Sequence, residues 1–342
     1  MKKILSRVKR IVIRVLKLPF VFFRRKRYKN APFSNIKFMV DTSVNEKQHE
    51  YVSCNTWYSH GLSIKTYAGF RKSYKLPVSI EHGTHFFWDY DYPPCELDNN
   101  LPGFLLLSGH QKNLYSRFTN RDIVPIGPYI HYAASLLTEE QILKEKKRLG
   151  KVLLFMPAHS NLYVTVKQEN NDILEKIKKI SGDFDTVRVC LHWFDVENDL
   201  YHHYKKLGWE CVCAGHETNN LFLSRLKSII ECSDFVITEG ITTGTGYAVY
   251  LNKPVMIFEP DIDLIMSERA EMDNVKYDDM KKSIKNPITD VISGLFKSYS
   301  NKITDEQYNI IDKYWGLTEI KNKDEMRKLI LNFENKMALY DN

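Results

Sequence analysis

The sequence predicts an α/β protein whose two parallel-sheet domains face each other across a cleft, preceded by a basic amphipathic helix. From Lys151 onward, short apolar runs alternate with helical stretches, as in a parallel, doubly wound sheet. Residues 31–135 carry a second, weaker set of apolar runs separated by turn-forming residues. The first 30 residues hold twelve Lys or Arg and no acid. A chain of 342 residues is long enough for two domains of ordinary size.

Residues 1–18 show the pattern of an amphipathic helix, with apolar residues at positions 4, 5, 8, 11, 12, 15 and 16. Pro19 stops or kinks it. The apolar run from 11 to 23 is too short to span a membrane and is interrupted by Arg14 and Lys17. It also lacks a signal-peptide cleavage site. We expect segment 1–30 to lie on an anionic membrane surface, at the cytoplasmic face of the cell membrane. The alternative is a helix docked on the protein's own body.

The positive charge is confined to this segment. The formal net charge is +7, and residues 1–30 account for +12, which leaves −5 on the other 312 residues. A mildly acidic body argues against a nucleic-acid partner. The six cysteines form no C-x-x-C pair, and several lie in apolar runs, so we expect free, buried thiols in a reduced cytoplasmic protein.

The elements divide the body into three parts. In 31–140 we expect strands at 36–40, 78–81, 104–108 and 123–126. A helix at 138–149, which ends at Gly150, then bridges to the second domain. In 141–265 we expect strands at 152–156, 186–192, 209–214, 235–238 and 255–258, separated by helices at 169–180, 196–207, 221–232 and 245–251. The residues after Pro260 are mostly helical and charged. We expect the helices of 266–342 to pack back on the two domains.

The strongest local signal is the run Thr238-Glu239-Gly240-Ile241-Thr242-Thr243-Gly244-Thr245-Gly246-Tyr247. It follows an apolar strand and opens a helix, where free N–H groups and the positive end of the helix dipole bind phosphate. The run lacks the Lys of a P-loop and does not match G-x-G-x-x-G. The other interpretation is a tight strand-to-helix turn that needs glycine for its backbone.

Histidines follow two other predicted strands. His159 and Ser160 follow 152–156, where His159 would donate to a diphosphate, and His82 follows 78–81. A histidine near its ordinary pKa can take the proton of an acceptor hydroxyl. Because ligands bind beyond the carboxyl ends of parallel strands, these residues should line one cleft.

Acidic residues give weaker signals. Glu217 follows the strand at 209–214 and could contact a nucleobase or ribose, as could Glu259 after 255–258. D-x-D pairs begin at 89, 183 and 261, a spacing that is common by chance, and His202 and His203 lie in a helix and should be solvated. We expect no metal and no cofactor.

Together these segments resemble the GT-B glycosyltransferases, which have two facing Rossmann-like domains and need no bound metal. His82-Gly83-Thr84 is similar to the His-Gly-Thr element of the CDP-glycerol glycerophosphotransferase family, and 233–238, Thr242-Thr243 and 251–255 to the second-domain pattern of that family. Residues 155–160 are similar to the His motif of bacterial sialyl- and Kdo-transferases. Glu239-Gly240 departs from the usual Asp-Tyr, which favours a sugar over a polyol phosphate.

The resemblance, which covers about residues 78–260, implies glycosyl transfer from a nucleotide-sugar donor to a lipid-linked or oligosaccharide acceptor, in lipopolysaccharide or capsule synthesis. His82 would be the acceptor-side base, with Glu239 as a second catalytic residue. The residues expected to bind the donor are His159, Ser160, Glu217, Thr242, Thr243, Gly244, Thr245 and Gly246.

Two alternatives stay open. A nucleotide-sugar 2-epimerase uses the same fold on a soluble substrate and needs no membrane segment. A non-catalytic membrane scaffold that binds nucleotides or glycans would tolerate loss of His82. A dehydrogenase is disfavoured because no dinucleotide fingerprint follows a predicted strand.

Overall fold

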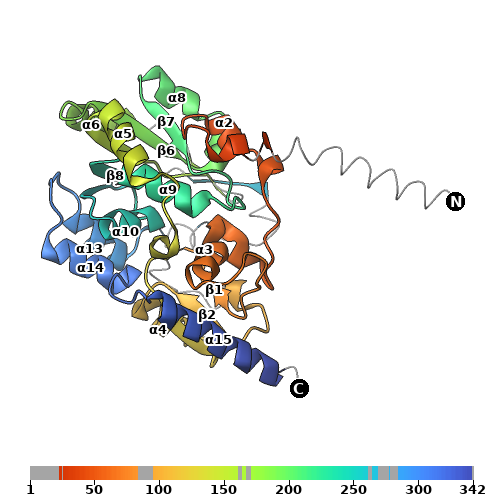
Figure 1. Cartoon of the computed structure of the whole chain (residues 1–342). Coiled ribbons are helices and arrows are strands. Elements are labelled where there is room, and N and C mark those ends of the chain that lie inside the picture. Colours follow the sequence, from red (N-terminus) through yellow and green to blue (C-terminus); the bar gives the residue numbers. More distant parts are fainter. Residues whose placement is uncertain are drawn as a thin grey trace.

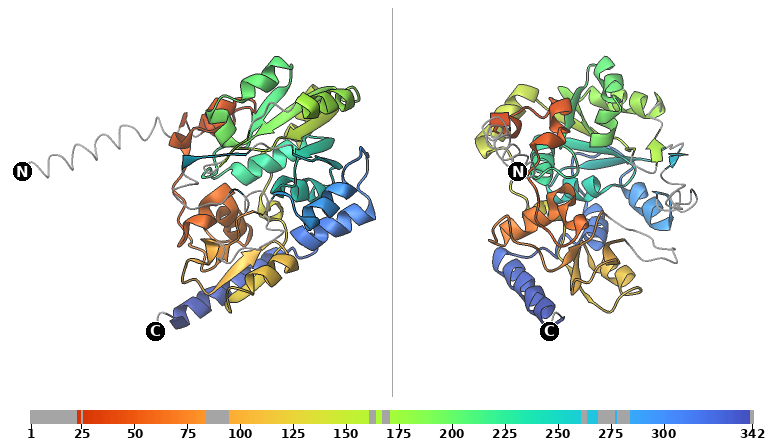
Figure 2. Two further views of the ribbon diagram at one scale, coloured as in Figure 1. Left: turned by 180° about the vertical axis from the view of Figure 1, so that it is seen from behind. Right: turned by 90° about the vertical axis from the view of Figure 1, so that its right-hand side faces the viewer.

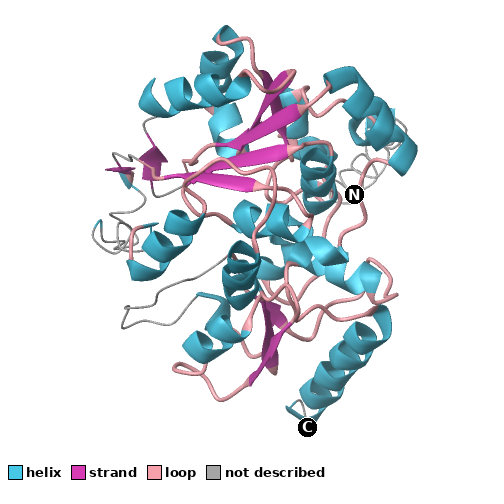
Figure 3. Ribbon diagram, turned by 90° about the vertical axis from the view of Figure 1, so that its left-hand side faces the viewer, coloured by secondary structure: helices cyan, strands magenta, loops and turns pink. Residues whose placement is uncertain are grey.

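The computed structural model describes residues 23, 24, 26–83, 95–160, 164–166, 171–260, 264–268, 277 and 284–340. The amphipathic helix expected at 1–18 lies outside these residues. Within them, no helix is both long and apolar enough to cross a bilayer. The predicted α/β fold is confirmed, because the chain forms two separate parallel sheets (Figure 3).

The larger sheet has the strand order β7-β6-β4-β8-β9, and every pairing in it is parallel. Its central strand β4 (Val152–Met156) is a buried apolar run, as expected for a strand covered on both faces. The others are β6 (Thr186–Leu191), β7 (Glu210–Cys213), β8 (Phe235–Glu239) and β9 (Val255–Phe258). The intervening helices are α6 (Asn171–Ser181), α7 (Trp193–Glu197), α8 (Tyr201–Lys206), α9 (Phe222–Glu231) and α10 (Thr243–Tyr250). All five strands lie where the sequence predicts them.

The smaller sheet has the order β1-β2-β3 and is also parallel. Its strands are β1 (Ser79–Ile80), β2 (Gly103–Leu106) and β3 (Asp122–Pro125). Helices α3 (His60–Tyr67) and α4 (Gly109–Tyr115) lie beside it, and 3-10 turns occur at 42–44, 53–59, 95–97 and 129–132. Helix α5 (Glu139–Leu149) then leads into β4, with a capping box at its start.

The strand expected at 36–40 is wrong. Residues Ile36–Met39 form the helix α2, and Ile36, Met39 and Val40 are the buried positions. This i, i+3, i+4 spacing is that of a helix face, and the alternation of Ile36, Phe38 and Val40 hid it. Helix α2 packs in the core of the larger sheet, beside β7 and α7.

One further expectation needs correction. The helix expected at 196–207 is two helices, α7 and α8, because Asp199 takes a left-handed conformation with φ 61° between them. The described residues after Pro260 are mostly helical, as expected, and they also include the short strand β10 (Leu264–Met266), which pairs antiparallel with β5 (Val164–Val166). Neither β5 nor the pairing carries a clear sequence signal.

The C-terminal helices return to both sheets. Helix α13 (Pro287–Leu295) packs against α14 (Asp305–Trp315), which contacts α10 and α4. Helix α15 (Lys323–Tyr340) then runs beside α3 and the smaller sheet, at the opposite end of the molecule from α8 (Figures 1 and 2). The chain therefore crosses between the two sheets more than once.

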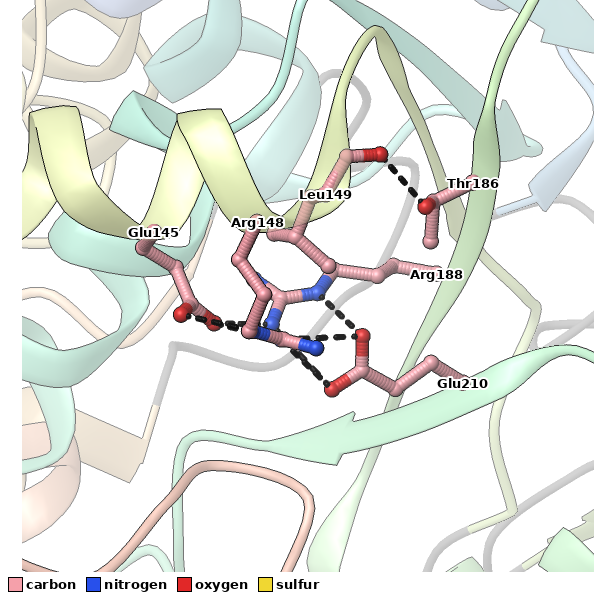
Figure 4. Close-up of polar contacts among 6 residues, drawn as sticks. All are labelled: Glu145, Arg148, Leu149, Thr186, Arg188 and Glu210. Carbon is pink, nitrogen blue, oxygen red and sulfur yellow. Dashed lines mark hydrogen bonds and ion pairs between the residues drawn. The ribbon is translucent and has the colours of Figure 1, made fainter.

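A buried guanidinium fastens α5 to the larger sheet. Arg188 in β6 is 1% exposed, and its Nε and Nη2 bind Glu210 and Glu145 at 3.1 and 2.6 Å (Figure 4). Arg148 joins the same two carboxylates from the surface. The hydrogen bonds to Arg148 and Arg188 lower the pKa of Glu145 to about 2. This network lies near the first residues of β6 and β7, at the edge away from the candidate site.

Candidate functional site

The carboxyl ends of β4, β6, β7 and β8 come to one edge of the larger sheet, since Met156 pairs with Thr238 and Leu191 with Cys213. A cavity of about 380 Å³ lies there, and residues that follow β1 of the smaller sheet close its other side. Its lining consists of Tyr58, His60, His82, Gly83, Met156, Pro157, His159, Cys190, Leu191, His192, Ala214, Phe222, Leu223, Leu226, Ile241, Thr242, Thr243, Gly244 and Tyr247. The predicted cleft between two parallel sheets is thus a lined cavity in the structure.

His82 enters from the smaller sheet. It follows β1, and its backbone N–H donates to Glu96 Oε1 at 2.9 Å. The imidazole packs between Tyr58, whose ring lies parallel at 5.3 Å, and Trp57, whose ring meets it at 4.7 Å and 72°. Burial, followed by the nearby His159, lowers the pKa of His82 to about 4. The ring is therefore neutral at pH 7 and can accept a proton, but it is a weaker base than the histidine of ordinary pKa that the sequence predicts.

His159 and His192 enter from the larger sheet. They follow β4 and β6, and their rings stack at 4.1 Å with an angle of 20°. Burial is the main cause that lowers the pKa of both rings. His192 is a site residue that sequence reasoning missed, because the strand expected at 186–192 included it. The feature that could have revealed it is its position, because His192 directly follows the last residue of β6, at the carboxyl end of that strand.

Two carboxylates support the loop that carries His159. Glu239 Oε2 accepts from Ala158 N at 3.1 Å, and Asp195 Oδ1 accepts from Ser160 N at 3.2 Å. Asp195 is fully buried, and burial raises its pKa to about 7. Two residues expected in the site therefore do not line the cavity. The Glu239 carboxylate and the backbone N–H of Ser160 instead make hydrogen bonds that fix the loop carrying His159.

The threonine-rich run divides in the same way. Thr242 is the N-cap of α10, and Thr242, Thr243 and Gly244 line the cavity. Thr245 faces inward, where its Oγ1 accepts from Thr242 N at 3.1 Å. The indole of Trp315 covers Gly246, and a Cβ at Gly246 would lie 2.1 Å from Trp315 Cδ1. The first turn of α10 thus opens onto the cavity, while Thr245 and Gly246 hold the helix in place.

Glu217 lies outside the cavity lining, in the loop after β7. Burial raises the pKa of its carboxyl. Its carbonyl oxygen accepts from Tyr58 N at 2.6 Å, so this loop is tied to the segment that precedes α3. Asn45 Nδ2, in the same segment, donates to Thr218 Oγ1 at 2.9 Å.

Tyr58 and His60 are further site residues that the sequence does not reveal. Tyr58 and Ser59 have φ values of 50° and 60°, and a non-glycine residue in this region costs about 1–3 kcal/mol. Such strain collects at functional sites. The backbone of Tyr58 and Ser59 is bound to residues more than 150 positions away, for example through the hydrogen bond from Leu223 N to Ser59 Oγ. No local sequence pattern predicts these contacts.

The charge of the cavity is unusual for a phosphate site. Among its described lining residues there is no Lys, Arg, Asp or Glu, and the polar side chains are those of four histidines, two threonines, two tyrosines and Cys190. In the part of the chain that the structure describes, no cluster of three or more His, Cys, Asp or Glu is arranged to hold a metal ion. Of the expected D-x-D pairs, only the one at 183 is described, and there Asp185 caps the N–H of Lys151 at 2.7 Å.

Comparison with known proteins gives only distant similarities. No family model matches the chain, and no curated protein matches it. Among solved structures, the wall teichoic acid polymerase TagF is 13% identical, with a TM-score of 0.45 over 99% of this chain and 98% of that one. The UDP-GlcNAc 2-epimerase from Methanocaldococcus jannaschii is 12% identical, with a TM-score of 0.32 over 68% and 62%. Phytolacca americana UGT2, complexed with UDP-2fluoro-glucose and pterostilbene, is 13% identical, with a TM-score of 0.32 over 69% and 53%. Similarities at this level do not assign an activity. The function is therefore inferred from the residues that line the cavity.

Proposed function

We propose that this chain is a metal-independent glycosyltransferase that moves a sugar from a nucleotide-activated donor to a lipid-linked or saccharide acceptor. One observation carries the proposal. A neutral histidine from the smaller sheet, His82, faces two histidines and the start of α10 from the larger sheet across one cavity. Base and leaving-group site thus come from opposite halves, as transfer between two bound substrates requires.

The arrangement fits the bond changes of glycosyl transfer. His82 takes the proton of the acceptor hydroxyl while the acceptor oxygen bonds to the anomeric carbon. The bond from that carbon to the donor phosphate breaks, and negative charge develops on the phosphate oxygen. The first turn of α10, with Thr242 and Thr243, then stabilises that charge. His159 and His192, neutral before binding, can each gain a proton beside the phosphate.

We place the acceptor at a membrane on the strength of the basic N-terminal segment, and propose surface polysaccharide synthesis, of lipopolysaccharide or capsule, at the cytoplasmic face as the setting. Twelve cations within 30 residues would contribute about 1 kcal/mol each near an anionic surface. The segment 23–40 packs on the larger sheet, where Tyr28 is buried. A chain that starts at residue 28 should keep its fold and lose binding to anionic vesicles. If it still sediments with them, the segment is not the anchor.

The first test is a thermal-shift screen with CMP, CDP, UDP, GDP and dTDP. A ligand at 100 times its Kd adds about 2.7 kcal/mol, which gives a clear shift. His82→Ala should then abolish transfer from the corresponding donor and leave nucleotide binding nearly intact. His202→Ala, on the exposed surface of α8, is the matched control.

The outcomes separate the alternatives. Unchanged turnover in His82→Ala would sink the assignment of the base. A product epimerised at the sugar without any acceptor would identify an epimerase. Nucleotide binding with no turnover of any donor would favour the scaffold.

A further inference from the structure

Two adjacent residues hold the halves of the site together through strained backbone. Tyr58 and Ser59 both lie in the left-handed region. Each is tied across the cavity to the larger sheet's half, since Tyr58 N donates to Glu217 O at 2.6 Å and Leu223 N donates to Ser59 Oγ at 3.2 Å. The Ser59 hydroxyl thereby satisfies one of the free N–H groups at the start of α9. Strain that is held by such specific bonds points to a role for the side chain it presents.

The Tyr58 side chain touches the candidate base and the donor half at once. Its ring lies parallel to the His82 imidazole, with 9° between the planes, and meets the edge of Phe222 at 4.7 Å. Its hydroxyl lies 3.4 Å from His192 Nε2, a hydrogen bond whose direction depends on the His192 tautomer. Burial raises the pKa of Tyr58, so the hydroxyl stays protonated.

The orientation of His82 depends on these rings. Histidines that act as bases are often oriented by a carboxylate on the second ring nitrogen, yet His82 Nδ1 is buried and has no hydrogen-bond partner in the described structure. Glu96 binds the backbone of His82. Glu81, the preceding residue, receives Leu107 N on its Oε2 at 3.1 Å. Packing by Tyr58 and Trp57 is what remains to fix the plane of the imidazole.

We propose that Tyr58 is a positioning residue that holds the imidazole of His82 over the cavity and links it to His192 in the opposite half. The catalytic meaning of this link rests on the proposed function. The positioning itself does not, because it concerns only where the His82 ring lies and how it titrates. Among the described residues, the titratable groups that contact His82 or act on it electrostatically are Tyr58, His60, Glu96, His159 and His192.

Two substitutions separate the two contacts of Tyr58. Tyr58→Phe keeps the ring and removes the hydroxyl, while Tyr58→Leu removes both. Tyr51→Leu is the matched control, because Tyr51 is 49% exposed, lies outside the cavity lining and has the ammonium of Lys75 over its ring. If Tyr58→Leu does not fold, Tyr58→Met is the alternative, because the long, flexible methionine side chain fills more of the space left by tyrosine and still lacks a planar ring.

The measurement is a pH titration of the imidazole NMR signals in the full chain, with His82 assigned from a His82→Gln sample. In Tyr58→Leu, we expect the His82 pKa to rise by about one unit or more as water reaches the ring. The part of its ring-current shift that comes from Tyr58 should disappear, and the part from Trp57 should stay. Tyr58→Phe should leave His82 unchanged and shift only His192. An unchanged His82 titration in Tyr58→Leu would overturn the proposal.

Kinetics then test the catalytic meaning, with the donor found in the nucleotide screen. Tyr58→Leu should lose about tenfold or more of kcat because misplacement of a base is costly, and Tyr58→Phe should restore most of it. A shifted His82 titration with unchanged kcat would support the positioning and refute His82 as the base. The two ideas therefore fail in different experiments.

Discussion

Gly246 offers a direct test of which residues in the threonine-rich run bind ligand and which pack. A Cβ at this position would lie 2.1 to 2.3 Å from three atoms of the Trp315 ring. Trp315 is fully buried, so the indole cannot swing into solvent to make room. Gly246→Ala must therefore shift α14 away from α10 or push the ring off its rotamer.

The magnitude follows from two opposing terms. Overpacking a tight core costs about 1–3 kcal/mol, and the contact at Gly246 is close enough to belong at the upper end. Alanine recovers about 1 kcal/mol of helix propensity. We expect a net loss of about 2 kcal/mol, which corresponds to a fall in Tm of about 4–8 °C.

Gly294 in α13 is the matched control, because a Cβ there meets nothing within 4 Å. Gly294→Ala should raise the Tm slightly, through helix propensity alone. Differential scanning calorimetry of both variants gives the comparison, and nucleotide affinity is measured below the transition. A Gly246→Ala protein with unchanged Tm and lost nucleotide affinity would refute the packing role and restore Gly246 to the donor site.

Three further predictions concern titratable groups. Burial raises the pKa of Asp195 to about 7, above its unfolded value, so the wild type should lose stability as pH rises from about 4 to 7. Asp195→Asn should remove that loss in urea titrations, and an unchanged pH dependence would contradict it. The pKa of Glu145 is lowered to about 2, so its contribution is present above the unfolded pKa of about 4.5 and disappears as pH falls toward 2. Arg188→Met should flatten part of this acid limb, because Arg148 stays on both carboxylates. It should lower stability by up to about 3 kcal/mol at pH 7, because Glu145 and Glu210 lose their buried partner; equal urea midpoints would argue against it. Finally, a phosphate beside His159 and His192 favours their protonated forms. Nucleoside diphosphates should therefore bind more tightly at about pH 6 than at about pH 8, two values that lie on either side of the ordinary histidine pKa. Calorimetry in two buffers of different ionisation enthalpy should detect proton uptake on binding, and none in the double glutamine variant.

The sequence was sufficient where structure is local. The run Val152–Met156 is short, continuously apolar and flanked by Gly150 and Pro157, which favours a covered strand, and glycines after helices marked their ends. Short runs with mixed periods were ambiguous, and Ile36–Met39 was assigned to the wrong class because two periods fit it equally well. Tertiary packing decided that case.

The site shows the same division. His82, His159 and Thr242 could be found because each follows a strand. Their roles relative to neighbours could not, since Glu239 supports a loop and Gly246 receives an indole from a helix some 70 positions later. Tyr58 lies in left-handed backbone that is held in part by long-range bonds to Glu217 and, through Ser59, to Leu223. Sequence patterns predicted where strands end. They did not predict which residues from distant parts of the chain pack against or bind those strand ends.

The return of α15 to the smaller sheet has a consequence for biosynthesis. Met326, Ile330 and Phe333 are fully buried in the core that also contains Val78 and Ile80 of the smaller sheet. Phe333 also lies against Gly103, where a Cβ would come within 2.4 Å of its ring. The ribosome translates β1 to β3 more than 180 residues before it translates α15, the helix that covers them. An apolar face of the nascent smaller sheet therefore stays uncovered, and accessible to chaperones, until α15 has been translated.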